Sequence, residues 1–276
     1  MHLRLFVILA LFAIQITKGS FAYAQTDFRV PYRQDSTISD PLGKPAQSST
    51  LYFPPEKFID SSYVWVLVPK ERVTQSMFTD SNYAVLPDSL VLERQIRTRI
   101  DTFKLNWFSY YLNRLQEPVL YNYPLRKEVY RLTWLRSFHP PVVVRLEKEG
   151  AKIRIITKVL SRIPELPGYR YSDAQGNVRL SDTSSAVPFK INTAKNVSKQ
   201  VYQEFIRLLT QERVLSLSPL GFRDRIGTDG SNWILETHRP EGYFFITRWT
   251  PEPTEALRVV GDYLLNLSDA KDERRY

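Results

Sequence analysis

The chain has 276 residues, a formal net charge of +9 and no cysteine. The absence of cysteine excludes disulfide bonds, thiolate metal sites and thiol nucleophiles, so hydrophobic packing has to hold the fold together. Hydrophobic residues make up 43% of the chain and aromatic residues 13%, which is enough for a real core and excludes global disorder. The cations occur as separate pairs, among them Arg126/Lys127 and Lys148/Lys152, and we interpret them as part of a solvated mixed-charge surface.

The first 24 residues have the features of a secretory signal peptide. Arg4 gives a positive start, residues 5–16 form an almost unbroken apolar run, and Ala22-Tyr23-Ala24 matches the small-x-small cleavage pattern. The run is too short to cross a hydrocarbon core of ~30 Å comfortably. We therefore expect export to the periplasm or the medium and cleavage before Gln25. The mature chain would have a net charge of +7, because the signal contributes Arg4 and Lys18 and no acid. No later segment has membrane length, so no transmembrane span is expected after cleavage.

The rest of the chain is predicted to form one α+β domain. Residues 25–60 are rich in Ser, Thr, Asp and Pro and predict a flexible lead-in; the domain covers 61–268, with an excursion at 161–186, and 269–276 is a polar tail. We expect an antiparallel sheet of about five or six strands with the helices packed mainly on one face.

Hydrophobic periodicity places the elements in chain order. A strand over 63–68 precedes a helix that begins at the cap Asp88 and ends near Gln116. Short links predict an antiparallel meander, and Ser198 is the expected cap of a second helix. The further strands and helices are expected at 128–135, 142–146, 153–160, 169–180 (a small hairpin), 198–212 (helix), 233–238, 243–249 and 254–267 (helix).

The predicted core consists of the apolar residues on the inward positions of these elements. They are Trp107, Tyr111, Leu132, Trp134, Val143, Ile155, Phe205, Leu208, Trp233, Leu235, Ile246, Leu257 and Leu264.

The C-terminal strand pair carries the most distinctive residues. If 239–242 form the turn, then His238 pairs with Tyr243, Glu236 faces Phe245, and Trp233 faces Arg248 in a cation–π pair. These residues could form a ligand platform, with Trp233, Arg248, Trp249 and His238 as its binding candidates. We favour the interpretation that they fix the register of the hairpin and pack under the last helix.

Two blocks of the sequence resemble a group of exported bacterial proteins of unknown function. One block is Asp229-Gly230-x-x-Trp233-Ile234-Leu235-Glu236 followed by Arg248-Trp249-Thr250-Pro251, and the other runs from Pro118-Val119-Leu120-Tyr121-Asn122 through 128–138 to Pro141. The resemblance covers roughly 90–268, with a gap around 161–186. It implies export and an α+β domain, and it carries no activity.

Signatures of catalysis are scarce. His139 lies in a turn flanked by proline, and His238 is expected at an exposed hairpin edge; no Gly-x-Ser-x-Gly elbow surrounds any serine, and the histidines lack the spacing of a metal site. The chain also has no glycine-rich phosphate loop, so we expect neither a metal nor a cofactor. A carboxylate-based hydrolase would use Glu236 first and Asp229 second, with Glu128 and Glu147 as other acids.

The sequence thus favours a non-catalytic exported binding or interaction protein over an enzyme. The expected partner is an envelope protein or a glycan. Nucleic acid is not expected, because Arg131 and Trp134 have opposite parity on one strand and point to opposite faces. The alternative hypothesis is a carboxylate-based hydrolase of an envelope or extracellular polymer.

Overall fold

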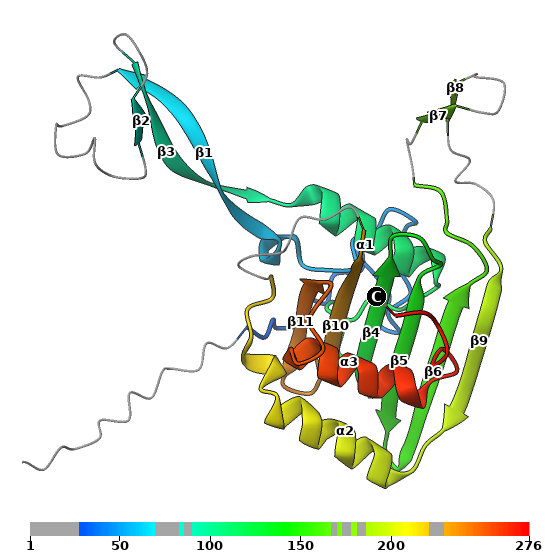
Figure 1. Ribbon diagram of the computed structural model, residues 1–276. Helices are drawn as coiled ribbons and strands as arrows, with labels where there is room; N and C mark the ends of the chain where they lie inside the picture. The colour runs from blue at the N-terminus through cyan, green and yellow to red at the C-terminus, as the bar shows by residue number, and fades with distance from the viewer. Residues whose placement is uncertain are drawn as a thin grey trace, which may run out of the picture.

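A computed structural model describes residues 28–69, 83–85, 90–166, 170–172, 178–180, 186–220 and 229–275. Its centre is an open six-stranded sheet in the order β11-β10-β4-β5-β6-β9 (Figure 1). All neighbouring strands are antiparallel, which confirms the predicted α+β class and its strand number. The strands are β4 (Glu128–Arg136), β5 (Val142–Glu149), β6 (Lys152–Leu160), β9 (Phe189–Asn196), β10 (Ser231–Arg239) and β11 (Gly242–Trp249).

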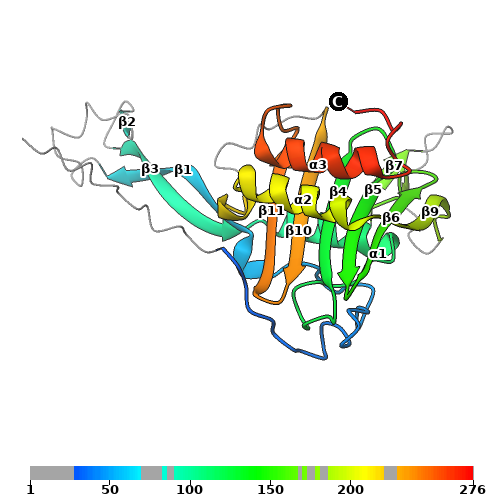
Figure 2. The ribbon, with the colours of Figure 1, turned by 90° about the horizontal axis from the view of Figure 1, so that it is seen from below.

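Of the three α-helices in the described residues, two lie on one face of this sheet, as predicted, and the third lies on the other. Figure 2 shows α2 (Lys199–Gln211) and α3 (Ala256–Leu267) side by side. Both pack on the sheet through one apolar stripe, which includes Phe205 on α2 and Leu264 on α3. The predicted cap of α2 is confirmed, because the hydroxyl of Ser198 accepts a hydrogen bond from the Val201 N–H at 3.3 Å.

The helix predicted to begin at Asp88 is shorter than expected. Residues Leu90–Ile100 form the strand β3, and α1 covers only Thr102–Arg114. The β-branched residues of this stretch favour a strand, and Asp101 provides the actual cap by accepting from the Lys104 N–H at 3.0 Å. Asp88 itself lies outside the described residues.

Two smaller sheets complete the described strands. β3 pairs along its whole length with β1 (Ile59–Pro69) and also with β2 (Tyr83–Val85), and Figure 1 shows this ribbon leading away from the six-stranded sheet. β7 (Arg170–Ser172) pairs with β8 (Val178–Leu180). The predicted strand at 63–68 and the predicted hairpin at 169–180 are both present. The described residues also form two short 3-10 helices, Pro55–Lys57 and Val214–Ser216.

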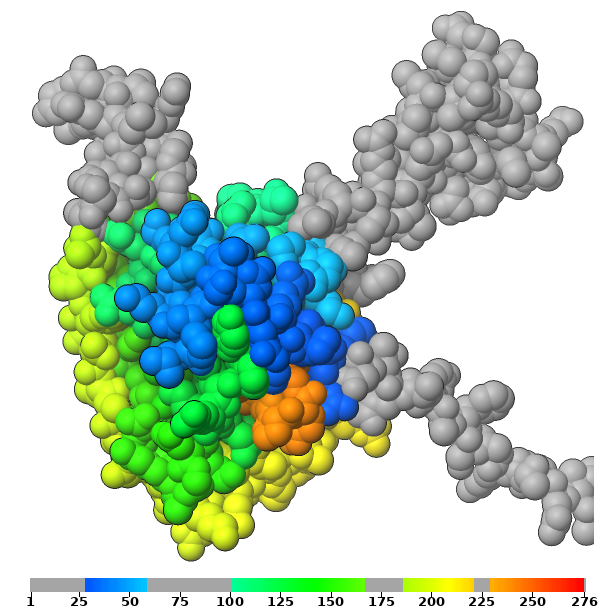
Figure 3. Space-filling view, turned by 180° about the vertical axis from the view of Figure 1, so that it is seen from behind, coloured from blue at the N-terminus to red at the C-terminus, as the bar shows by residue number. Residues whose placement is uncertain are grey.

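The face of the sheet that carries α1 is also covered by residues 28–58, which the sequence predicts to be a flexible lead-in. Val30 forms a two-bond β-bridge with Tyr243 on β11, and Tyr52, Phe53 and Phe58 are fully buried. Figure 3 shows this segment spread over the surface of the molecule, seen from the side opposite to that of Figure 1. The segment is polar on average but contains a few large aromatic side chains. Burial of these side chains stabilises the packed position of the segment.

The C-terminal residues predicted to be a polar tail also pack on the domain. Ala270 is buried, Asp269 binds Lys195 of β9 at 2.8 Å, and Glu273 binds Arg136 at the end of β4 at 2.8 Å. Among the residues that the structure describes, no helix is long and apolar enough to cross a membrane. The predicted signal peptide lies outside those residues.

The core agrees closely with the prediction. Only Trp107 and Leu208 of the predicted set are half-buried, and the others are buried. The core has two parts, one on each face of the sheet, because both faces are covered. This double coverage places several charged side chains of the second face in the interior.

Candidate functional site

Glu236, the first acid predicted for catalysis, is held by an arginine in the interior. It lies on β10 opposite Arg131 on β4. The guanidinium binds the carboxylate through two hydrogen bonds of 2.7 Å, and the hydroxyl of Tyr243 donates to the same carboxylate at 3.0 Å. Burial raises the pKa of Glu236 and the neighbouring Arg131 opposes that rise. Both charged side chains are fully buried, so neither presents a surface to a substrate.

The Arg131–Glu236 pair continues into a larger cluster, which we call the buried ionic row: Glu236, Arg131, Glu117, Arg145 and Lys158. Glu117 follows α1, and its carboxylate lies 2.9 Å from the Lys158 ammonium and in direct contact with the Arg145 guanidinium. Burial alone would raise the pKa of Glu117, but Arg145, Lys158 and Arg131 together lower it to about 2. The row has three cations and two carboxylates, and Arg145 extends it to Glu147, whose carboxylate lies 2.8 Å from the guanidinium. Such mutual pairing of buried charges is typical of a structural network.

Asp229, the second predicted acid, does not join Glu236 in a catalytic pair. It is exposed and precedes β10. Asp229 lies before Ser231, the first residue of β10. The five residue steps from Ser231 to Glu236 along this strand already span about 16 Å. The two carboxyl groups of a glycosidase lie ~5–9.5 Å apart, so these two acids lack the required geometry.

His238 is buried, which corrects the prediction of an exposed hairpin edge. Its Nε2 accepts a hydrogen bond from the Leu125 N–H at 2.9 Å, and Nδ1 lies 2.7 Å from the Leu120 carbonyl oxygen. Since a backbone N–H can only donate, the ring is neutral and Nδ1 carries the proton. Residues 120–125 and Tyr32, whose ring centroid lies 4.7 Å from that of the imidazole, cover the hairpin edge.

The other hairpin candidates stabilise the packing of β10 and β11. The predicted register is confirmed, with Trp233 opposite Arg248 and His238 opposite Tyr243. Trp233 is fully buried, and the cation over its ring, at 4.6 Å, is Arg258 of α3. Arg248 donates to the carbonyl oxygens of residues 218, 219 and 247. Trp249 is half-buried beside Gly230, so these residues serve the fold rather than an open platform.

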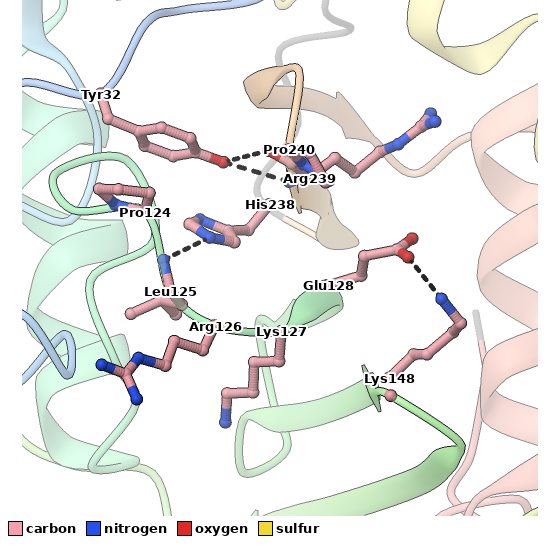
Figure 4. Close-up of a pocket in the computed structure, with 11 residues that line it drawn as sticks. Tyr32, Pro124, Leu125, Arg126, Lys127, Glu128, Lys148, His238, Arg239 and Pro240 are labelled. Carbon is pink, nitrogen blue, oxygen red and sulfur yellow. Dashed lines mark hydrogen bonds and ion pairs between the residues drawn. The ribbon is translucent and has the colours of Figure 1, made fainter.

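The structure has a cleft at the end of the sheet where β4 begins and β5 ends. Its volume is about 360 Å³. The cleft lies where the loop before β4, the β5–β6 turn and the β10–β11 turn come together (Figure 4). We call it the basic cleft; it is lined by Tyr32, Pro124, Leu125, Arg126, Lys127, Glu128, Lys148, Gly150, His238, Arg239 and Pro240.

Four cations and one acid line the basic cleft. Three of the cations are paired: Lys127 with Glu147 at 2.7 Å, Lys148 with Glu128 at 2.8 Å, and Arg239 with Glu241 at 3.2 Å. Arg126 is exposed and makes no ion pair within the described part of the chain.

The chemistry available in the basic cleft is recognition of an anion. No serine, threonine or cysteine lines it, and its one tyrosine hydroxyl, on Tyr32, donates to the Arg239 carbonyl oxygen at 2.6 Å. Burial raises the pKa of Tyr32, which keeps that hydroxyl protonated. A charge-assisted hydrogen bond from Arg126 is the interaction that a bound carboxylate or phosphate would gain.

From the sequence alone, Arg126/Lys127 and Lys148 are expected to be separate surface charges. The predicted strand order could have indicated that these cations lie together. In an antiparallel meander the start of the strand at 128 and the turn at 149–150 lie at the same end of the sheet. Tyr32 could not be placed, since it belongs to the segment predicted to be flexible.

No metal centre is evident in the described ranges, where no group of three or more His, Asp and Glu side chains is placed to hold an ion. Comparisons with protein-family models, curated proteins and solved structures found no match for this chain.

Proposed function

We propose that this chain is a non-catalytic exported binding protein whose basic cleft takes an anionic group of an envelope partner. The single observation that carries this proposal is Arg126, an exposed cation without an ion-pair partner in the described residues, at a cleft of about 360 Å³. Each of the three neighbouring cations is balanced by one acid, so Arg126 supplies the net positive charge of the cleft. The ligand chemistry is a carboxylate or a phosphate, borne by a protein or by an acidic glycan.

The alternative, a carboxylate-based hydrolase, gains no support from the geometry. Its first acid, Glu236, has no accessible surface, and its second, Asp229, lies before the start of the strand that carries Glu236. Glu128 lines the basic cleft but is bound by the Lys148 ammonium and by the hydroxyls of Tyr130 and Tyr202. These contacts lower the pKa of Glu128, against the opposing effect of its burial, so it is a poor proton donor at neutral pH.

Binding of inorganic phosphate, tri-glutamate and tri-galacturonate to the mature protein, measured by isothermal titration calorimetry, tests the proposal. We expect at least one of them to bind, and Arg126→Ala to weaken that binding about tenfold, because one charge-assisted hydrogen bond is lost. Arg274→Ala is the matched control: Arg274 is also exposed, and it lies beside Glu273, which binds the far end of β4. Equal weakening by both variants, or no binding at all, would overturn the cleft as the site.

The same mixtures, followed by chromatography for products, test the enzyme hypothesis. Hydrolysis of any probe that survives Arg126→Ala but is lost in a carboxylate variant would favour the hydrolase. Export is tested separately by mass spectrometry of the native protein, where we expect an N-terminus at Gln25. An intact N-terminus in the membrane fraction would instead identify residues 1–24 as an anchor.

A further inference from the structure

The two outer strands of the six-stranded sheet, β11 and β9, differ in how their edges are covered. On β11, Tyr243 exchanges two backbone hydrogen bonds with Val30, and the Thr247 N–H donates to the Pro219 carbonyl oxygen. β9 forms the opposite rim of the sheet (Figure 1), and β6 is its one partner among the described strands. One edge of the sheet is therefore covered by other segments, and the other edge is open.

The pairing with β6 shows which backbone groups of β9 face away from the sheet. The Val197 N–H donates to the Ile153 carbonyl oxygen at 3.0 Å. Residues in an antiparallel ladder alternate between bonding to one side and to the other, so Lys195 and Thr193 also bond towards β6. The residues between them direct their N–H and C=O groups outward, and within the described chain these groups have no hydrogen-bond partner; they are Asn192, Ala194 and Asn196.

The side chains along this edge leave room for another strand. Residues 192–195 are all exposed, and because successive side chains point to opposite faces, both faces of β9 are open there. A register shift opposite Leu160 ends the regular ladder near the start of β9, so the usable edge runs from 191 to 196. An unpaired edge of this kind is a template for a further strand.

Charged side chains, lysine above all, normally guard open edges against pairing. β9 carries two charged residues, Lys190 and Lys195. Both are neutralised by residues that follow α3: Lys190 binds Glu273 at 2.6 Å, and Lys195 binds Asp269 at 2.8 Å. The edge therefore presents no unpaired charge that would select a strongly acidic or basic partner strand.

A second copy of β9 complements this edge. In an antiparallel pair centred on a two-fold axis at Ala194, Asn192 lies opposite Asn196 of the second copy, and Thr193 lies opposite Lys195. No charged residue then faces a like charge, and the two Lys195 side chains are offset along the strands with each already bound to its own carboxylate. Each Asn amide has both donors and an acceptor for the Asn opposite. All three outward-facing residues gain backbone partners, as the self-complementary surface of a two-fold dimer requires.

We propose that β9 pairs with β9 of a second copy of this chain, in an antiparallel ladder centred on Ala194 that joins two six-stranded sheets into one. The inference does not rest on the proposed function, because no residue of β9 lines the basic cleft.

Sedimentation equilibrium of the mature protein, from low to high micromolar concentration, tests the proposal. We expect a reversible dimer. Ala194→Pro removes an N–H that bonds outward and leaves the bonds to β6 intact, a position where an edge strand tolerates proline. It should raise the dimer dissociation constant at least about tenfold, because two symmetric hydrogen bonds at the centre of the ladder are lost. Ala194→Val changes the same side chain but keeps the N–H, so it should still dimerise, and so should Arg126→Ala.

Hydrogen exchange of the unaltered protein gives a second measurement that does not depend on the folding of a variant. The amides of Asn192, Ala194 and Asn196 should exchange more slowly as the protein concentration rises, while the amides of β11 should not change. A monomer at every concentration, or a dimer that forms without protection of these three amides, would overturn the proposal. So would a protein that stays monomeric and gains this protection from an eight-residue alternating Thr-Val peptide, because β9 would then accept a foreign strand in place of its own copy.

Discussion

At the scale of single residues, Arg131 and Glu236 depend on each other. Glu236→Leu would leave a buried guanidinium without its main carboxylate, and we expect a loss of ~3–5 kcal/mol in the free energy of unfolding. Replacing both residues, Arg131→Met with Glu236→Leu, should recover most of that loss, because Glu117 keeps Arg145 and Lys158 as partners. Urea unfolding followed by circular dichroism measures all three proteins.

The same residues distinguish a structural role from catalysis. If Glu236→Gln left the unfolding free energy unchanged while abolishing a hydrolytic activity, the carboxylate would be doing chemistry and our assignment of the pair would be wrong.

His238 makes the stability of the protein depend on pH. Burial lowers its pKa below the usual 6.5, and Lys127 acts in the same direction. As the pH falls, His238 is protonated in the unfolded chain before it is protonated in the folded one. Its contribution to the free energy of unfolding is therefore complete above pH 6.5 and is lost as the pH drops below that value. Protonation of Nε2 would also break its hydrogen bond with the Leu125 N–H, because two N–H donors would then face each other.

Unfolding free energies compared at about pH 7.5 and about pH 5.5 reveal this titration, since carboxylates stay ionised over most of that interval. The fall in stability should be smaller in His238→Gln and unchanged in His139→Gln. A fall of the same size in both variants would assign the pH dependence to other groups.

At the scale of elements, α3 and β10 meet at a glycine. A Cβ on Gly261 would lie 2.7 Å from the Trp233 ring. Gly→Ala inside a helix ordinarily stabilises by up to about 1 kcal/mol, but overpacking costs ~1–3 kcal/mol, so Gly261→Ala should destabilise. Trp233→Ala should cost ~3–5 kcal/mol. Trp249→Ala should cost less, because Trp249 is half-buried.

A double-mutant cycle on unfolding free energies checks this contact. In the Trp233→Phe background, Gly261→Ala should cost less or become stabilising, because the smaller ring leaves room for the methyl group. Additive effects would mean that the two residues do not share a contact.

The elements that sequence reasoning placed well are those fixed by local patterns. The turn after Arg239 sets the register of β10 and β11 to the residue, and Ser198 marks the start of α2. The error at 90–100 arose because apolar residues at mixed spacings fit a helix or a strand, and pairing with β1 decided the outcome.

At the scale of the whole molecule, what could not be predicted is what lies across the second face of the sheet. Nothing local in the sequence indicates that residues 28–58 pack on the sheet and pair with Tyr243. This segment nevertheless buries the second face of the sheet, which would otherwise be exposed to solvent. The buried ionic row follows from it, because Arg131 and Arg145 would otherwise face water. The basic cleft was missed for the same reason, since its lining comes from segments as far apart as Tyr32 and Pro240.

The position of β10 in the sheet imposes an order on folding. β4, β5 and β6 follow each other through short turns, whereas the Arg131–Glu236 contact joins residues 105 positions apart. Closing so long a loop costs more chain entropy and is slow compared with forming the local meander. Until the residues beyond 230 arrive, β4 has an unpaired edge and Arg131 lacks its carboxylate. That edge is where two unfinished chains would pair, so a newly made molecule is most prone to aggregation just before its C-terminal hairpin docks.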